Sequence, residues 1–201
     1  MKNAVIGVLG SGNGSNFQAI LDAIYKGEVS ARVGCVISNI SDAYILERAR
    51  KASIPAYFVD PSPFKNKLEG RAEEEVIKLL KGHDVEYVVL AGFMMIVKAK
   101  LLNEYSGRII NIHPSLLPAF PGLEAWKQAL DYGVKITGCT VHFVDEGVDT
   151  GPIIMQEAVP VFDNDTPESL HKRIQEKEHI IYPIALQMVI RGEVKYRVRR
   201  G

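Results

Sequence analysis

Near its N-terminus the chain reads Ala4-Val5-Ile6-Gly7-Val8-Leu9-Gly10-Ser11-Gly12-Asn13-Gly14-Ser15-Asn16. Its first six residues carry no polar side chain, which is typical of a strand buried on both faces of a parallel sheet. Glycines alternate through the turn that follows, and glycine permits the tight backbone path that leads a strand directly into a helix. The stretch therefore predicts a strand over residues 4–9 and a helix over residues 15–25.

Short apolar runs continue to alternate with amphipathic segments over the next hundred residues. This pattern predicts further strands at residues 32–38, 56–59, 87–90 and 109–112, and further helices at residues 43–51 and 65–80. A repeated strand–helix order favours a parallel sheet with helices on both faces. We therefore expect an α/β protein with a Rossmann-like, doubly wound, mostly parallel sheet.

The pattern changes after residue 120. A helix over residues 123–132 is followed by Gly133, a residue that commonly ends helices. Two strands, at residues 135–144 and 152–161, flank an acidic turn and predict an antiparallel addition to the sheet. The run Asp165-Thr166-Pro167-Glu168 predicts the start of a last helix that reaches residue 190. No linker or repeat interrupts the chain, so we expect one domain over residues 1–201.

Composition narrows the class of protein. The 201 residues contain 24 Lys and Arg and 24 Asp and Glu, and this balance gives no support for binding nucleic acid or a membrane. The two cysteines, Cys35 and Cys139, lie in apolar runs, as buried thiols of a reducing compartment do. The apolar run at residues 4–9 is too short to cross a bilayer. We expect a cytoplasmic protein that acts on small molecules.

The glycine-rich turn is a candidate phosphate site. Free amides at a helix N-terminus and the helix dipole favour an anion, and glycines let the ligand approach the backbone closely. The turn lacks the Gly-Lys-Ser/Thr of a P-loop, and its spacing does not fit the dinucleotide fingerprint. A tight turn without a ligand is the alternative. Its place at the carboxyl end of a strand favours phosphate binding.

The run Asn111-Ile112-His113-Pro114-Ser115-Leu116-Leu117-Pro118 places an amide and an imidazole two residues apart at a strand end. Side chains at this spacing leave a strand on the same face. An amide can stabilise an oxyanion while an imidazole moves a proton, so the pair suits acyl transfer. Alone, Asp149 reads as an ordinary turn acid and His142 as a structural strand residue. No His, Cys, Asp or Glu set has the spacing of a metal site.

Several motifs then occur together and in order. They are Gly12-Asn13-Gly14-Ser15-Asn16, Val89-Leu90-Ala91-Gly92-Phe93-Met94, the run from Asn111 to Pro118, Pro121-Gly122, the stretch from Val141-His142-Phe143-Val144 to Asp149-Thr150-Gly151-Pro152, and Glu178-His179 with Tyr182-Pro183. With these motifs the chain resembles the glycinamide ribonucleotide formyltransferase family over nearly its whole length.

The resemblance implies the reaction and the residues that serve it. The amine of glycinamide ribonucleotide would attack the formyl carbon of 10-formyltetrahydrofolate, and N-formylglycinamide ribonucleotide and tetrahydrofolate would leave, with no metal. It implies catalysis by Asn111, His113 and Asp149. It implies ribonucleotide binding by Gly12, Asn13, Gly14, Ser15, Asn16 and Glu178. It implies folate binding by Lys67, Met94, Met95, Ile96 and Val97, together with Asn111 and Asp149.

The same resemblance divides the domain into a phosphate-binding half, residues 1–100, and a catalytic and folate-binding half, residues 101–201. Family members are monomers or homodimers. This chain departs from the family at Met95, where an Arg usually follows Gly-Phe-Met, and Lys67 or Arg71 would stand in for a substrate-contacting Arg. A lysine cannot form the planar two-pronged contact of an arginine.

Other readings remain. Methionyl-tRNA formyltransferases, sugar-nucleotide formyltransferases and formyltetrahydrofolate deformylases share parts of the pattern but are usually longer. A nucleotide-binding module without catalysis, in which Asn111 and His113 are structural, is the alternative from another class.

Overall fold

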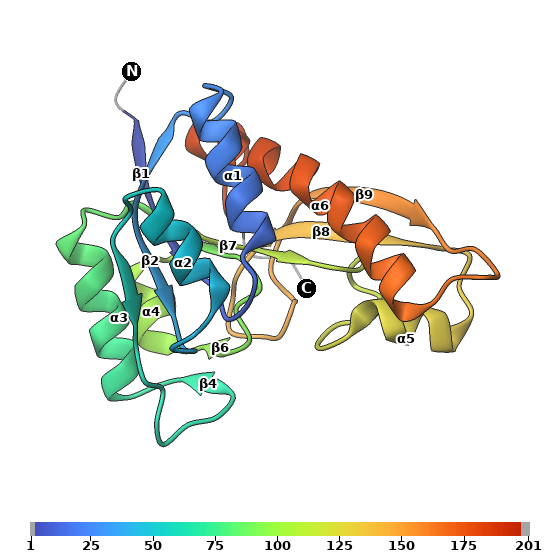
Figure 1. The fold of residues 1–201 in the computed structure, drawn as a ribbon, viewed down its shortest axis with the longest axis horizontal. Coiled ribbons are helices and arrows are strands. Elements are labelled where there is room, and N and C mark those ends of the chain that lie inside the picture. The colour runs from blue at the N-terminus through green and yellow to red at the C-terminus, as the bar shows by residue number, and fades with distance from the viewer. Residues whose placement is uncertain (1–2, 198–201) are drawn as a thin grey trace.

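A seven-stranded sheet with helices on both faces forms the core of the computed structural model, which describes residues 3–197 (Figure 1). The strand order is β3-β2-β1-β5-β7-β8-β9. The first five strands are parallel to one another, β8 pairs antiparallel with β7, and β9 pairs antiparallel with β8. The doubly wound sheet and its antiparallel addition are therefore confirmed. Its strands are β1 (Ala4–Leu9), β2 (Ala31–Ser38), β3 (Ala56–Phe58), β5 (Tyr87–Leu90), β7 (Ile109–His113), β8 (Ile136–Phe143) and β9 (Ile153–Pro160).

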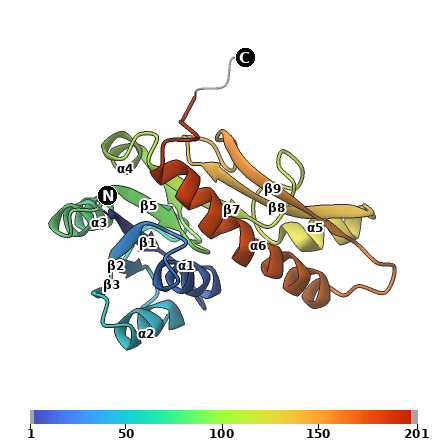
Figure 2. The same ribbon diagram turned by 90° about the horizontal axis from the view of Figure 1, so that it is seen from above.

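Helices cover the two faces unequally (Figure 2). One face carries α1 (Ser15–Tyr25), α2 (Tyr44–Lys51) and the long α6 (Pro167–Ile190), and the other carries α3 (Arg71–Gly82) and α4 (Ala99–Glu104). The short α5 (Ala125–Tyr132) packs against α6 beside the antiparallel strands. Within residues 3–197 no helix has the length and apolar character needed to cross a membrane.

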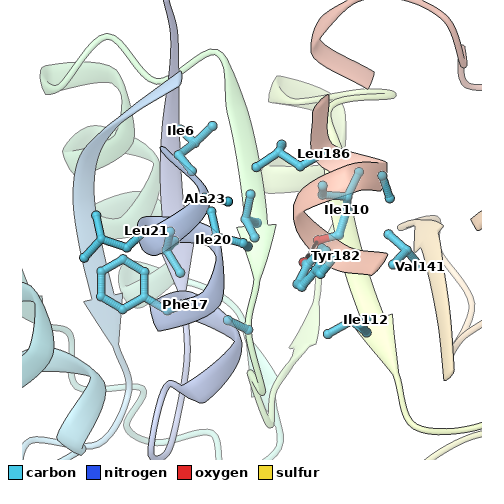
Figure 3. Close-up of a cluster of buried hydrophobic side chains, with 14 of the residues drawn as sticks. Ile6, Phe17, Ile20, Leu21, Ala23, Ile110, Ile112, Val141, Tyr182 and Leu186 are labelled. Atoms are coloured by element: carbon cyan, nitrogen blue, oxygen red, sulfur yellow. Dashed lines mark hydrogen bonds between the residues drawn. The ribbon is translucent and has the colours of Figure 1, made fainter. Parts of the chain in front are cut away.

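Successive side chains of β1 belong in turn to two hydrophobic cores, one on each face of the sheet. Ile6 and Val8 pack into the cluster under α1 and α6, whereas Val5 and Leu9 pack into the cluster under α3 and α4. In the first cluster Phe17 and other apolar side chains of α1 lie against the sheet (Figure 3). Burying one such side chain stabilises the fold by roughly 1.5–3 kcal/mol. The continuous apolar character of residues 4–9 thus reflects burial on both faces of the sheet.

Tyr182 of α6 is fully buried and ties two strands together (Figure 3). Its hydroxyl lies 2.8 Å from the carbonyl oxygen of Leu90 and 3.1 Å from that of Ile110, so its single proton serves both acceptors. Leu90 ends β5, and Ile110 directly precedes Asn111 in β7. The helix is therefore fixed to the carboxyl end of β5 and to the residue of β7 that precedes Asn111.

The order of the strands reverses between β1 and β5, which makes the carboxyl ends of these strands the expected place for a ligand. Two segments meet there. The amide of Ser11 donates to the carbonyl of Gly92 at 3.0 Å, and the amide of Met94 donates to the Ser11 hydroxyl at 2.8 Å. The glycine-rich turn and the segment after β5 therefore meet at this reversal of strand order, where the ligand crevice of an open parallel sheet is expected.

The predicted helix over residues 65–80 is wrong at its start. Helix α3 begins at Arg71, because Gly70 has φ 66° and ψ −133°, a conformation that excludes a helix and that side chains disfavour. The preceding residues form β4 (Lys67–Leu68), which pairs with β6 (Ile96–Val97) in a separate two-stranded sheet. Neither short strand nor α4 was predicted, since two-residue strands depend on a distant partner.

The ends of the later helices follow their local chemistry. Helix α5 starts two residues after the predicted position, because Glu124 has a left-handed φ of 52°. At α6 the predicted cap is confirmed: the Thr166 hydroxyl accepts from the Ser169 amide at 3.2 Å, and the Ser169 hydroxyl accepts from the Thr166 amide at 3.0 Å. Satisfying these amides starts the helix that carries Glu178 and Tyr182.

Candidate active site

The antiparallel pairing of β7 and β8 assembles the polar cluster. Asn111 lies opposite His142, and His113 lies opposite Thr140. Residues two apart on a strand share a face, so Asn111 and His113 point the same way, as their spacing predicted. The pairing brings His142 to the same place, although it lies 31 residues away in sequence.

His113 lies between two acceptors. Its Nδ1 is 3.3 Å from Oδ2 of Asp149, and its Nε2 is 2.9 Å from the carbonyl oxygen of Phe120. A carbonyl and a carboxylate only accept, so a doubly protonated ring satisfies both contacts. Only 6% of the side chain of His113 is exposed, so water competes little for these bonds. Both ring nitrogens are therefore engaged, and the ring is held in a fixed orientation beside Asp149.

Asp149 joins two loops. The residue has a left-handed φ of 55°, and its Oδ2 also accepts the Gly122 amide at 2.8 Å. Asp145 holds the rest of the loop, because its Oδ1 accepts from the Gly147 amide and from the Thr150 hydroxyl. The structure thus brings Asp149 to His113, from which it is 36 residues distant, and the sequence pattern alone did not require this contact.

His142 is the functional neighbour that sequence reasoning missed. Its Nδ1 donates to the carbonyl oxygen of Phe143 at 2.8 Å, which leaves Nε2 to accept from Nδ2 of Asn111 at 3.2 Å. Burial lowers the pKa of His142 from its ordinary value, which favours the neutral ring that this arrangement needs. The nearest oxygen of Asp149 is 3.7 Å from Nε2. His142 therefore fixes the Asn111 amide and leaves its second N–H free.

Between residues 12 and 16, no backbone amide has a hydrogen-bond partner in the part of the chain that the structure describes, although Gly14 itself is buried. Gly14 caps α1 in a left-handed conformation with φ 75° and offers no side-chain bond to the first amides of the helix. Asn16 donates from Nδ2 to Oε2 of Glu178 at 2.8 Å, which links α1 to α6. Glu178 is only 4% exposed, and burial raises its pKa to about 7. The predicted ribonucleotide residues therefore form one connected group, with Gly12 and Asn13 exposed beside it.

The segment predicted to bind folate is only partly open. Met94 is 59% exposed, and Ile96 is half-buried. Met95 and Val97 point into the core under α3 and α4, so their side chains are not available to a ligand there. Alternate burial follows from the extended backbone that leads into β6.

Lys67 is brought to this segment because β4 pairs it with Ile96. Its ammonium lies 4.6 Å from the centre of the Phe64 ring and forms an ion pair with Glu69. Arg71 is exposed at the first turn of α3. Between residues 3 and 197, no three His, Cys, Asp or Glu side chains are grouped so that they could hold a metal ion.

Comparisons with known proteins identify the family of the chain. The model of the formyl transferase family matches residues 4–186. The phosphoribosylglycinamide formyltransferase of Bacillus subtilis is 43% identical over 190 residues, which cover 92% of this chain and 96% of the relative. That of Haemophilus influenzae is 41% identical and covers 96% and 90% of the two chains.

Solved structures agree as well. Glycinamide ribonucleotide transformylase 1 from Symbiobacterium toebii superposes with a TM-score of 0.91 and 49% identity, over 98% of this chain and 91% of that one. A formyltetrahydrofolate deformylase from Pseudomonas syringae pv. tomato superposes with a TM-score of 0.87 and 31% identity, but this chain covers only 64% of it. The chain therefore belongs to the formyl transferase family, among the phosphoribosylglycinamide formyltransferases.

Proposed function

We propose that the chain transfers the formyl group of 10-formyltetrahydrofolate to the amine of glycinamide ribonucleotide, a step of purine biosynthesis. The observation that carries the proposal is the meeting of Asn111, His113 and Asp149 at one end of the crevice, 3.3 Å separating the ring of His113 from the carboxylate. Asn111 and His113 lie on β7 and Asp149 on the loop between β8 and β9, and an amide, an imidazole and a carboxylate suit acyl transfer.

The chemistry follows from charge development. Attack of the amine on the formyl carbon forms a carbon–nitrogen bond, places negative charge on the formyl oxygen and makes the nitrogen cationic. The free N–H of Asn111 and the protonated ring of His113 stabilise the oxygen. The Asp149 carboxylate keeps the ring oriented and accepts the proton that the nitrogen releases, directly or through water. The bond to N10 of the folate then breaks, and N10 takes a proton.

The two substrates approach from the two sides of the crevice. The ribonucleotide phosphate binds the amides of the turn from Gly12 to Asn16, and its ribose contacts Glu178. The folate binds along Met94–Val97, beside Lys67, with Asn111 and Asp149 at its formyl end. This arrangement assigns phosphate binding to residues 1–100 and catalysis to residues 101–201. The enzyme acts in the cytoplasm as a monomer or a homodimer.

A direct assay tests the proposal. The protein is incubated with 10-formyltetrahydrofolate and glycinamide ribonucleotide, and both products are followed by mass spectrometry, with His113→Ala as the control. Formylated ribonucleotide that depends on His113 supports the proposal.

A second function has one observation in its favour, the similarity to a formyltetrahydrofolate deformylase. Release of formate and tetrahydrofolate without formylation of the amine would replace transfer by hydrolysis. Binding of ribonucleotide with no turnover in the wild type would leave only a binding module.

A further inference from the structure

The carbonyls of the glycine-rich turn are held from behind by α2. The backbone amide of Ile45 donates to the carbonyl oxygen of Gly12 at 3.0 Å. Arg48, one turn later, donates from Nε to the carbonyl oxygen of Asn13 and from a terminal nitrogen to Oδ1 of Asn13, both at 2.8 Å. Two consecutive carbonyls of the turn therefore face α2.

This orientation determines where the amides point. The peptide bonds after Gly12 and Asn13 are trans, and in a trans peptide the N–H and the C=O point in opposite directions. The N–H groups of Asn13 and Gly14 are therefore turned away from α2. The turn also packs closely on α2, because a Cβ at Gly14 would lie 2.6 Å from the Ile45 side chain. Helix α2 thus sets the donors of the turn before any ligand binds.

Arg48 is itself held in place. Its guanidinium lies over the Tyr44 ring, 4.9 Å from the ring centre, and its other terminal nitrogen donates to Gln18 at 3.2 Å. Across the described part of the chain, no carboxylate lies within ion-pair distance of this guanidinium, so its charge is not neutralised by a neighbour. The charge of Arg48 also acts on a residue of α6. Burial lowers the pKa of His179, which is next to Glu178, and the positive charge of Arg48 lowers it further.

Arg48 also borders open space beside the first residue of α1, although residues 10–14 do not line that space. A cavity of about 530 Å³ lies between α1 and α6, and Ser15, Arg48 and His179 are among its lining residues. A dianionic group at the amides of the turn would lie across the Asn13–Gly14 peptide from this guanidinium, whose charge no carboxylate of the described residues neutralises. Arginine suits this role because its planar fork makes several hydrogen bonds in a fixed geometry.

We propose that Arg48 is a positioning residue for the ribonucleotide phosphate: it orients the Asn13–Gly14 peptide so that its amide faces the anion, and it supplies positive charge behind that peptide. This inference rests on the proposed function. It assigns α2, outside the predicted substrate-binding residues, a part in recognising one substrate and none in the chemistry. Arg48 should therefore influence binding of the phosphate and leave the formyl transfer step unchanged.

The test crosses two variants with two substrates. Arg48→Gln removes the charge and the two-pronged contact, and Arg48→Lys keeps the charge alone. Each is assayed with glycinamide ribonucleotide and with the corresponding glycinamide riboside, which lacks the phosphate. Arg50→Gln is the matched control, because Arg50 is an exposed arginine of the same helix. Circular dichroism and thermal melting check that each variant is folded.

For Arg48→Gln we expect the KM for the ribonucleotide to rise about tenfold or more, with kcat and the KM for folate nearly unchanged. With the riboside, kcat/KM should match that of the wild type. The KM of Arg48→Lys for the ribonucleotide should lie between those of Arg48→Gln and the wild type. Arg50→Gln should behave as the wild type. If Arg48→Gln does not fold, the same comparison with Arg48→Lys decides.

Two results would overturn the inference. One is an unchanged KM for the ribonucleotide in a folded Arg48 variant. The other is an equal loss of kcat/KM with both substrates, which would make the role of Arg48 purely structural. Failure of the proposed function looks different, because the wild-type enzyme would then formylate neither substrate.

Discussion

The two ends of the crevice are built from different parts of the chain. At the proposed catalytic end the polar groups are side chains: His113 lies 3.3 Å from Asp149, and Asn111 forms a hydrogen bond with His142. At the phosphate end, backbone amides of the glycine-rich turn provide the donors, and side chains of α2 and α6 hold the turn. The difference suggests that changes at the first end lower turnover, and that changes at the second end weaken binding.

The largest effect is expected at the catalytic end. His113→Ala, Asn111→Ala and Asp149→Asn should each lower kcat by about 100-fold or more, because each removes a donor or its orienting partner from the oxyanion. The KM for the ribonucleotide should change little, since the turn is untouched. Steady-state kinetics on folded protein checks this. Near-normal kcat in His113→Ala would break the division between the two ends.

A smaller loss is expected one contact further away, at His142. His142→Leu removes the acceptor that holds Asn111, and one hydrogen bond is worth roughly 1 kcal/mol, so kcat should fall about fivefold. His142→Gln keeps an acceptor near the position of Nε2 and should recover part of this loss. If both variants lose the same activity, the contact with Asn111 has no role in turnover.

His142 should also make both stability and turnover decrease at low pH. Because burial lowers its pKa in the folded protein, the unfolded chain takes up a proton first as pH falls below about 6.5. The free energy of unfolding should therefore decrease as pH falls through this window, and kcat should decrease at still lower pH, when Nε2 is protonated. Urea unfolding at pH 5 to 8, with His142→Gln as the comparison, measures the first effect.

Glu178 should show the behaviour of the phosphate end. Glu178→Gln should raise the KM for the ribonucleotide about tenfold and leave kcat nearly unchanged, because a charged acceptor for the ribose is lost. In the wild type the KM should rise as pH falls below about 7, when Glu178 is protonated. Protonation of the phosphate raises KM as well, but that part persists in Glu178→Gln. If kcat falls by a larger factor than KM rises, Glu178 does not act in substrate binding alone.

The same pKa affects stability. With a pKa raised to about 7 from 4.5, Glu178 keeps a proton in the folded state that the unfolded chain has already released. Its contribution to stability is therefore present below pH 4.5 and is lost as pH rises through 7. Glu178→Gln should flatten this slope in thermal melts.

The smallest effect is expected outside both ends. Thr166→Ala removes the cap of α6 and should cost about 1 kcal/mol, or about 2–4 °C in Tm. Kinetic constants should stay within twofold, since Thr166 lies three turns before Glu178. A change in KM or kcat would show that stability and function are coupled along α6, and would weaken every kinetic assignment above.

Periodic apolar patterns and local turn chemistry were enough to predict the sheet, its antiparallel addition and the cap of α6. The short strands β4 and β6 were not predictable, because two residues carry no period and their pairing is between distant segments. His142 and Arg48 were missed for the same reason. An alternating strand histidine looks structural until the register places it opposite Asn111, and an arginine on an amphipathic helix looks solvated until α2 packs on the turn.

Helix α6 fixes the distance between the two proposed substrate sites. Glu178 reaches the turn through Asn16, and Tyr182, four residues later, reaches the carbonyls beside the catalytic strand. One helical turn advances about 5.4 Å, so the interval between these anchors is fixed by backbone geometry. A residue inserted between them would rotate one anchor by about 100° relative to the other. Redesign of either substrate site must therefore leave the spacing of these two side chains unaltered.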